Sequence, residues 1–149
     1  MKVLSVKQPW AYLLVQGIKP IENRPRRTHF RGRILIHASA KPDIFFKGEN
    51  LAFTPAQWKD INKKVDTNKP DYKKDIFIYS AIIGSVEIVD CVENHPSIWA
   101  VEGQYHYVIA NPILFDTPIT GVKGQLGLWN YDIQICGLCG QPFGPSCVE

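Results

Sequence analysis

Long apolar segments are missing from this 149-residue chain, and so are internal repeats and low-complexity stretches. No run of apolar residues approaches the ~20 that a membrane-spanning helix needs. The first ten residues, MKVLSVKQPW, hold no apolar segment followed by a small-residue cleavage site, so we expect no signal peptide. These absences predict a cytoplasmic protein with no membrane partner.

Cysteine is also scarce, and three of the four cysteines lie near the end of the chain, in CGLCGQPFGPSC. Cys91 falls in a predicted strand and is interpreted as a small buried apolar residue. The CxxC turn of Cys136 and Cys139 is typical of zinc knuckles, with Cys147 as a third sulfur ligand. A fourth ligand is missing, and the last forty residues contain no histidine. We expect no required cofactor and favour a reduced tail over structural zinc, with a disulfide least expected in the cytosol.

Acidic residues are nearly absent from the first third of the chain. Residues 1–48 contain ten lysines and arginines but only two acids, Glu22 and Asp43, for a local charge of +8. Residues 49–149 carry seven basic and twelve acidic side chains, so the net charge of the whole chain is only +3. This asymmetry favours an anionic partner for the N-terminal part, and the alternative is a solvated basic face without a partner.

The remaining composition is typical of one globular domain with more strand than helix. Pro9 suits a first helical position and Gly17 the residue after a helix end, which predicts a short helix between them. Thr54 and Gln57 form a capping box for a second helix that continues to about Val65, before a polar surface loop over 66–75. Apolar or alternating segments predict strands at Lys2–Val6, Ile21–Arg24, Gly32–Ala38, 76–91, 105–109 and 125–131. Successive strands with few helices favour a small closed or partly open barrel.

The segment from Leu4 to Ser39 carries the most information. Its residues 19–33 hold six basic side chains and a single acid. Three motifs stand out in the chain: the Gln8-Pro9-Trp10 entry to the first helix, the GxKxxExR pattern of Gly17, Lys19, Glu22 and Arg24, and the RGRILIHA strand, with Gly127-Leu128-Trp129 later. On these residues the chain, over roughly 2–132, resembles the ASCH family, whose domains are similar in fold to the RNA-binding PUA domains.

The resemblance implies the fold class and the domain organisation. It implies an α+β, PUA-like fold: a small mixed β-barrel of about five or six strands with flanking helices. That domain covers residues 1–132, and a short cysteine-containing tail covers 133–149. The family also implies a cleft lined by the GxKxxExR residues, and we expect a monomer.

The side chains of this pattern suit an anionic ligand. Glu22 and Arg24 point to the same face if 21–24 is a strand. Lys19 is a point charge suited to phosphate, and Arg24 is a planar fork suited to phosphate or a base edge. An ion-pair network without a ligand is the alternative. We predict RNA or a modified nucleoside as partner, with Gln8 and His37 shaping the cleft wall and the backbone contacted by Arg26, Arg27 and Arg31.

Aromatic side chains add a second feature of RNA-binding sites. Trp10 and Trp99 are predicted to stack on unpaired bases, and Trp99 is expected to be accessible because it follows a His-Pro-Ser-Ile turn. For Trp129 we favour a place in the core. A lone histidine in an apolar strand, such as His37, is more often a hydrogen-bonded core residue than a catalyst.

Two other functions stay open. A branch of the ASCH family hydrolyses acetylated cytidine with a lysine, a threonine three residues later and a distant glutamate. Lys19 matches that lysine, but Glu22 stands at the threonine position, where it would serve as a general base. The distant acid would be Glu87, Glu93 or Glu102. A ribonuclease would draw its acid and base from Lys19, His37 and His106, and a protein-binding adaptor is the third possibility.

Overall fold

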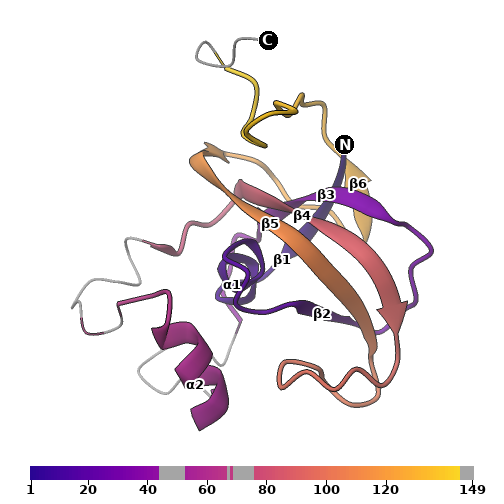
Figure 1. Ribbon diagram of the computed structural model, residues 1–149. Helices are drawn as coiled ribbons and strands as arrows, with labels where there is room; N and C mark the ends of the chain where they lie inside the picture. The colour runs from indigo at the N-terminus through magenta and orange to yellow at the C-terminus, as the bar shows by residue number, and fades with distance from the viewer. Residues whose placement is uncertain (44–52, 67, 69–75, 145–149) are drawn as a thin grey trace.

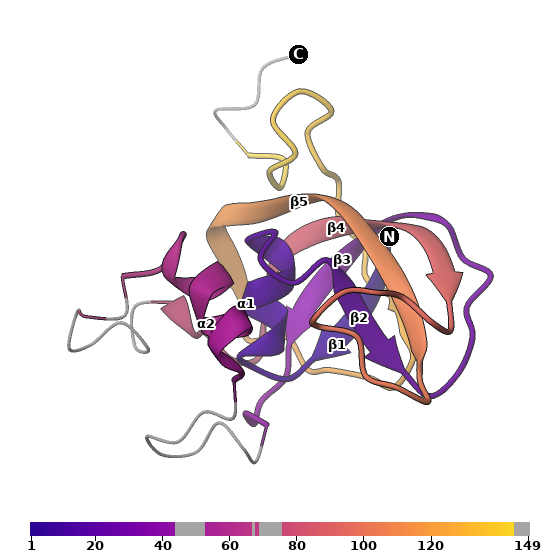
Figure 2. The same ribbon diagram turned by 60° about the horizontal axis from the view of Figure 1, so that its bottom comes forward.

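The computed structural model describes residues 1–43, 53–66, 68 and 76–144. Within them, six strands form one curled, half-closed barrel, and two small helices accompany it (Figures 1 and 2). The predicted α+β fold with a small mixed barrel is thereby confirmed. Most of the predicted 66–75 loop lies outside the described residues, and so does Cys147. No helix in the described part of the chain is long and apolar enough to cross a membrane.

The order of the elements follows the prediction, with different bounds for several of them. The helices are α1 (Trp10–Val15) and α2 (Pro55–Asn62), and the capping box of Thr54 and Gln57 is present. The strands are β1 (Lys2–Val6), β2 (Ile21–Arg24), β3 (Gly32–Ala38), β4 (Ala81–Val92), β5 (Tyr105–Thr120) and β6 (Leu128–Asn130). The second helix therefore ends before the predicted Val65, and the strand predicted at 125–131 is shorter than expected.

Two strand boundaries are wrong for reasons that the backbone explains. Strand β4 begins at Ala81 rather than at residue 76, because Ser80 has a left-handed φ of 52° that interrupts an extended chain. Strand β5 continues past the predicted end at 109 to Thr120. Asn111 takes a φ of 48° beside a shift in the β4–β5 register, so Pro112 sits at an irregularity and does not end the strand.

The sheet order places the two edge strands on either side of an opening. The order is β2-β5-β4-β3-β1-β6, in which only the β1–β3 pair is parallel. No ladder joins β2 to β6 among the described residues. The two edges are linked indirectly, because Arg24 at the end of β2 donates from Nη2 to the carbonyl of Ser5 on β1, at 2.9 Å. A side chain therefore spans the gap that backbone pairing leaves open.

Apolar residues pack on both faces of the curled sheet. Helix α1 lies against one face of the sheet (Figure 2). There Ala11, Leu14 and Val15 pack in one cluster with Leu4, Ile36 and other strand residues. Helix α2 packs against the outer side of α1 through Ile61 and a cluster of aromatic rings. The other face is covered by the second half of β5 and the chain after it, with Trp129 in that cluster, as predicted. Trp99 was expected to be accessible, but it is 3% exposed because it packs between α1 and α2.

Candidate functional site

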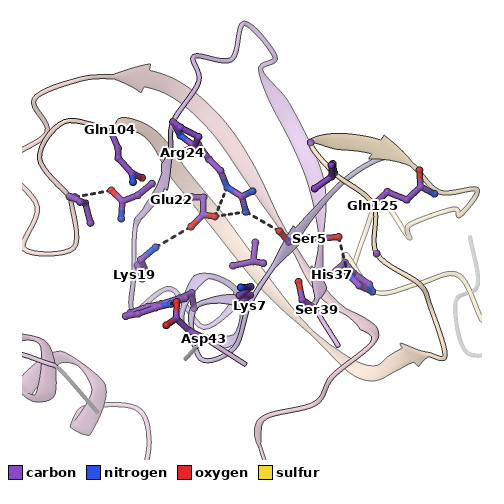
Figure 3. Close-up of a pocket in the computed structure, with 18 of the residues that line it drawn as sticks. Ser5, Lys7, Lys19, Glu22, Arg24, His37, Ser39, Asp43, Gln104 and Gln125 are labelled. Carbon is purple, nitrogen blue, oxygen red and sulfur yellow. Dashed lines mark hydrogen bonds and ion pairs between the residues drawn. The ribbon is translucent and has the colours of Figure 1, made fainter. Parts of the chain in front are cut away.

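A cleft of about 1030 Å³ opens beside the gap between the two edge strands. Strands β1 and β2, the start of α1 and the segment 123–127 form its walls (Figure 3). Polar and charged side chains dominate the part drawn in Figure 3, which labels Ser5, Lys7, Lys19, Glu22, Arg24, His37, Ser39, Asp43, Gln104 and Gln125. The GxKxxExR pattern therefore contributes three of its side chains, Lys19, Glu22 and Arg24, to one cavity.

Glu22 lies at the centre of a buried ion network. Its Oε1 accepts from Lys19 Nζ at 3.1 Å, and its Oε2 accepts from Arg24 Nε at 2.9 Å and lies 2.7 Å from Arg24 Nη2. Glu22 is 5% exposed and Lys19 is 4% exposed. The alternation of side chains along β2 brings Glu22 and Arg24 to the same face, as the sequence predicted.

The environment of Glu22 keeps it ionised. Burial alone would raise the pKa of its carboxyl, but the charges of Lys19 and Arg24, and the hydrogen bonds from both, outweigh that effect and lower the pKa below the ordinary 4.5. One carboxylate therefore faces two cations. The network carries a net charge of about +1 in a largely desolvated position, where electrostatic attraction is stronger than at an exposed surface.

Arg24 connects this network to the open part of the cleft. Its Nε and Nη2 are used by Glu22 and by the Ser5 carbonyl. Its Nη1 donors have no hydrogen-bond partner among the residues that the structure describes. The side chain is 26% exposed, much more than its two network partners. Arg24 can therefore reach a ligand while staying anchored at the floor of the cleft.

Trp10 forms the wall beside Lys19. The Lys19 ammonium lies 5.5 Å from the centre of the Trp10 ring, in a cation–π arrangement. The indole Nε1 of Trp10 donates to Asp43 at 3.2 Å. Trp10 is half-buried and contributes to the cleft lining. Its ring orients Lys19 and leaves part of its own surface facing the cavity.

His37 holds the opposite wall through a chain of hydrogen bonds. Its Nε2 lies 2.7 Å from the Val122 carbonyl, which can only accept, so Nε2 carries the proton. Its Nδ1 then accepts from the Ser5 hydroxyl at 3.0 Å, and Ser5 Oγ accepts from Trp129 Nε1 at 3.1 Å. His37 is 1% exposed, and a Cβ at Gly124 would lie 2.9 Å from its ring. His37 thus fixes the segment after Val122 against the barrel, the hydrogen-bonded role expected of a lone histidine.

Several predicted residues lie away from the cleft. Gln8 is fully buried and bonds to the backbone of Tyr12 and Ile78, so it anchors the entry to α1 and does not form the wall. Arg31 turns back to the carbonyls of Thr28 and Phe30 and lies 3.7 Å from Asp90. The cleft lining does not include Arg26, Arg27, Arg31 or the three candidate distant acids, Glu87, Glu93 and Glu102.

The structure also adds residues that the sequence reasoning did not assign to the site. Lys7 and Lys123 are exposed cations on the cleft rim, and Gln104 and Gln125 lie at its opposite ends (Figure 3). Lys7 stands directly before the QPW motif, and Lys123 lies in GVKGQLG, a glycine-rich segment typical of a binding loop. The glycine-rich segment around Lys123 can be seen in the sequence. Nothing in the sequence, however, places residue 123 in the same cleft as residue 7.

A metal site does not emerge from the described residues. They contain no group of three or more histidine, cysteine or acidic side chains arranged to hold an ion. Cys136 and Cys139 lie in the C-terminal segment, away from the cleft lining, and the third candidate ligand, Cys147, is outside the described residues.

Comparison with known proteins gives a consistent set of matches. The sequence profile of the ASCH domain matches residues 4–119. Activating signal cointegrator 1 from Homo sapiens is 30% identical over 141 residues, and its counterpart from Mus musculus is 29% identical over 141 residues. Each match covers 89% of this chain and 22% of the relative. The chain therefore spans about a fifth of the length of these relatives, within which it matches one segment.

Proposed function

The chain belongs to the ASCH domain family, and from that premise we propose that it is an RNA-binding domain that holds single-stranded RNA in the cleft above Glu22. The Lys19–Glu22–Arg24 network is the observation that carries this proposal. Two cations share one buried carboxylate, so the floor keeps a positive charge that an anion can neutralise. The similarity in fold between ASCH domains and the RNA-binding PUA domains supports the same assignment.

The charges around the cleft fit a phosphate-bearing ligand. Lys7 and Lys123 on the rim have no acidic partner among the described residues, and Arg24 keeps its Nη1 donors for a ligand. An arginine fork can donate two parallel hydrogen bonds to a phosphate or to a base edge. Lysines add non-directional attraction along a backbone. Arg24 is therefore assigned to orient the ligand, and the lysines to attract it.

The size of the cleft favours an unpaired strand over a duplex. Its volume of about 1030 Å³ lies slightly above the ~300–1,000 Å³ that is usual for small-ligand sites. One nucleotide and parts of its neighbours fit such a space. A double helix is too wide to enter it. A modified nucleoside is the smallest ligand consistent with this site.

The geometry of Glu22 favours binding over hydrolysis. Both of its carboxylate oxygens accept hydrogen bonds from cations, and its lowered pKa makes it a weak general base. None of the three candidate distant acids lines the cleft. An adaptor function gains no specific support from the cleft, because the two cations at its floor, Lys19 and Arg24, are engaged by Glu22.

The proposal is tested by binding of short single-stranded RNA to the whole chain, measured by fluorescence anisotropy. Lys19→Met removes the charge but keeps most of the volume of the side chain, and Glu22 keeps Arg24 as its counter-ion. We expect affinity to fall about tenfold or more, because a charge-assisted contact to phosphate is lost. Lys63→Met is the matched control, since Lys63 is an exposed lysine outside the cleft that pairs with Asp60.

The salt dependence of the same binding provides a second criterion. If the cleft neutralises about four phosphates, the slope of log K against log salt should be near −3, at ~0.7 per phosphate for a single strand. A slope near zero, or equal losses in Lys19→Met and Lys63→Met, would contradict an electrostatic RNA site in this cleft.

A further inference from the structure

An arginine–tyrosine cation–π contact lies next to the cleft. The guanidinium carbon of Arg27 is 5.4 Å from the centre of the Tyr105 ring. Arg27 is exposed and Tyr105 is half-buried, with part of the tyrosine packed against the apolar core. The planar guanidinium is exposed, so the part of it that does not face the tyrosine ring is available to a ligand. We refer to Arg27 and Tyr105 together as the platform.

The platform stands beside the residue that orients the ligand. In the β2–β5 pairing, Arg24 lies directly opposite Tyr105, and opposite residues of an antiparallel pair project to the same face. Gln104, the residue before Tyr105, lines the cleft at the end away from Gln125 (Figure 3). Because Tyr105 directly follows Gln104, an RNA strand that left the cleft at this end would pass close to the platform.

The backbone next to Arg27 is held in place by a hydrogen bond from β5. The hydroxyl of Tyr107 donates to the carbonyl of Arg26 at 2.9 Å, which ties the segment after β2 to β5. Arg31 and Arg33, in contrast, are engaged with carbonyls and with Asp90 and Glu87. The cations of segment 19–33 thus form two groups. Some line the cleft or lie next to it, and the others bond to carbonyls and carboxylates of the fold itself.

From this arrangement we propose that the ligand is an RNA of at least two consecutive unpaired nucleotides, one in the cleft and the next stacked on the platform. The inference rests on the proposed function of the cleft and raises the smallest ligand of that site from a single nucleoside to two linked nucleotides. Every base has a flat face, so stacking on an arginine plane adds affinity without demanding a particular sequence. Arg27 also adds a positive charge close to the phosphate that joins the two nucleotides.

The test compares two probes, adenosine monophosphate and tetra-adenylate, on the whole chain at one salt concentration. The wild type should bind the tetranucleotide at least about tenfold more tightly than the mononucleotide, since one stacked base adds about that much. Arg27→Ala should remove most of this preference. Arg27→Lys keeps the charge but not the plane, and it should lose most of the preference too. Lys63→Met should keep the wild-type ratio.

Three results would overturn the inference: equal affinity of the wild type for the two probes, an Arg27→Ala protein that keeps the wild-type ratio, or full recovery of that ratio in Arg27→Lys. Tyr105→Leu, which keeps an apolar side chain in the core, checks the other half of the platform and should lower the ratio as well. These results differ from failure of the cleft itself, in which Lys19→Met binds both probes as tightly as the wild type.

Discussion

At the scale of single residues, Glu22 determines the character of the cleft. A buried carboxylate is costly unless opposite charges and hydrogen bonds compensate its lost hydration. Lys19 and Arg24 provide that compensation at 3.1 Å and 2.9 Å. The arrangement depends on all three side chains. Changing Glu22 should therefore affect both the stability of the protein and the pH dependence of that stability.

Replacing Glu22 by glutamine should destabilise the protein by about 3 kcal/mol at neutral pH, because Lys19 is left buried without its counter-ion. The lowered pKa of Glu22 means that the folded state holds this proton less readily than the unfolded state. The stabilisation that ionised Glu22 provides is therefore complete above about pH 4.5 and is lost as the pH falls below that value.

Thermal or denaturant unfolding between neutral and acidic pH measures this effect. The gap in unfolding free energy between the wild type and Glu22→Gln should narrow as the pH drops below 4.5. Glu102→Gln is the control with the same chemical change, since Glu102 is exposed and outside the cleft. Two pH profiles that run parallel for wild type and Glu22→Gln would contradict the proposed electrostatic role.

At the scale of elements, the packing of β4 against β5 and α1 depends on one glycine. Gly84 lies in β4, where the β5 backbone and α1 both approach it closely. A Cβ at this position would collide with the carbonyl of Ile113 and would lie 2.8 Å from a methyl carbon of Val15. The backbone oxygen has nowhere to move without breaking the ladder, so the close approach requires glycine.

We expect Gly84→Ala to cost about 3 kcal/mol of unfolding free energy, at the upper end of the cost of overpacking a core. Gly137→Ala provides the comparison, because a Cβ at Gly137 meets nothing within 4 Å, and it should change stability by no more than ~0.5 kcal/mol. Chemical denaturation of the two variants measures these changes in unfolding free energy. A Gly84→Ala protein as stable as Gly137→Ala would show that α1 and β5 can separate at little cost.

The same elements show where sequence reasoning reaches its limit. Local signals correctly predicted β1, β2 and β3, the capping box before α2 and the shared face of Glu22 and Arg24. They failed at β5, because a proline and a left-handed asparagine usually end a strand, whereas here pairing with β4 resumes beyond them. That outcome depends on contacts with a distant strand, which no local pattern encodes.

The site was predictable to the same extent. The motif residues Lys19, Glu22 and Arg24 could be chosen because the segment resembles the ASCH family, and the structure places them in one cavity. Lys7 and Lys123 could not be assigned to one cleft from the sequence, because only the tertiary structure places both in its lining. Trp99 shows the converse error, since a turn sequence predicted exposure where tertiary packing buries the ring.

At the scale of the whole molecule, the C-terminal segment is part of the fold although it lies outside the cleft. Ile133 and Ile135 pack against the cluster that contains Trp129. Gln141 donates to the carbonyl of Leu114 at 3.0 Å and accepts from the amide of Asp116 at 2.8 Å. The segment therefore covers the second half of β5, on the side of the sheet opposite α1.

Truncation after Asp132 should separate stability from binding. Loss of the two partly buried isoleucines should remove about 2–4 kcal/mol of stabilisation. RNA affinity should change by no more than about twofold, since none of the removed residues lines the cleft and distant sites act independently. Unfolding and anisotropy measurements on the same sample compare the two quantities. A large loss of affinity in a folded truncated protein would contradict a site confined to the cleft.

The buried network around Glu22 has a consequence for the rates of binding. Lys19 and Arg24 are already immobilised before a ligand arrives, so the entropy cost of ordering these long side chains falls on folding and not on association. Encounter should then be fast and nearly independent of which strand arrives, because it is governed by the charge of the rim. Selection among RNAs would be expressed in how long each one stays, and residence time is the quantity in which related ligands should differ most.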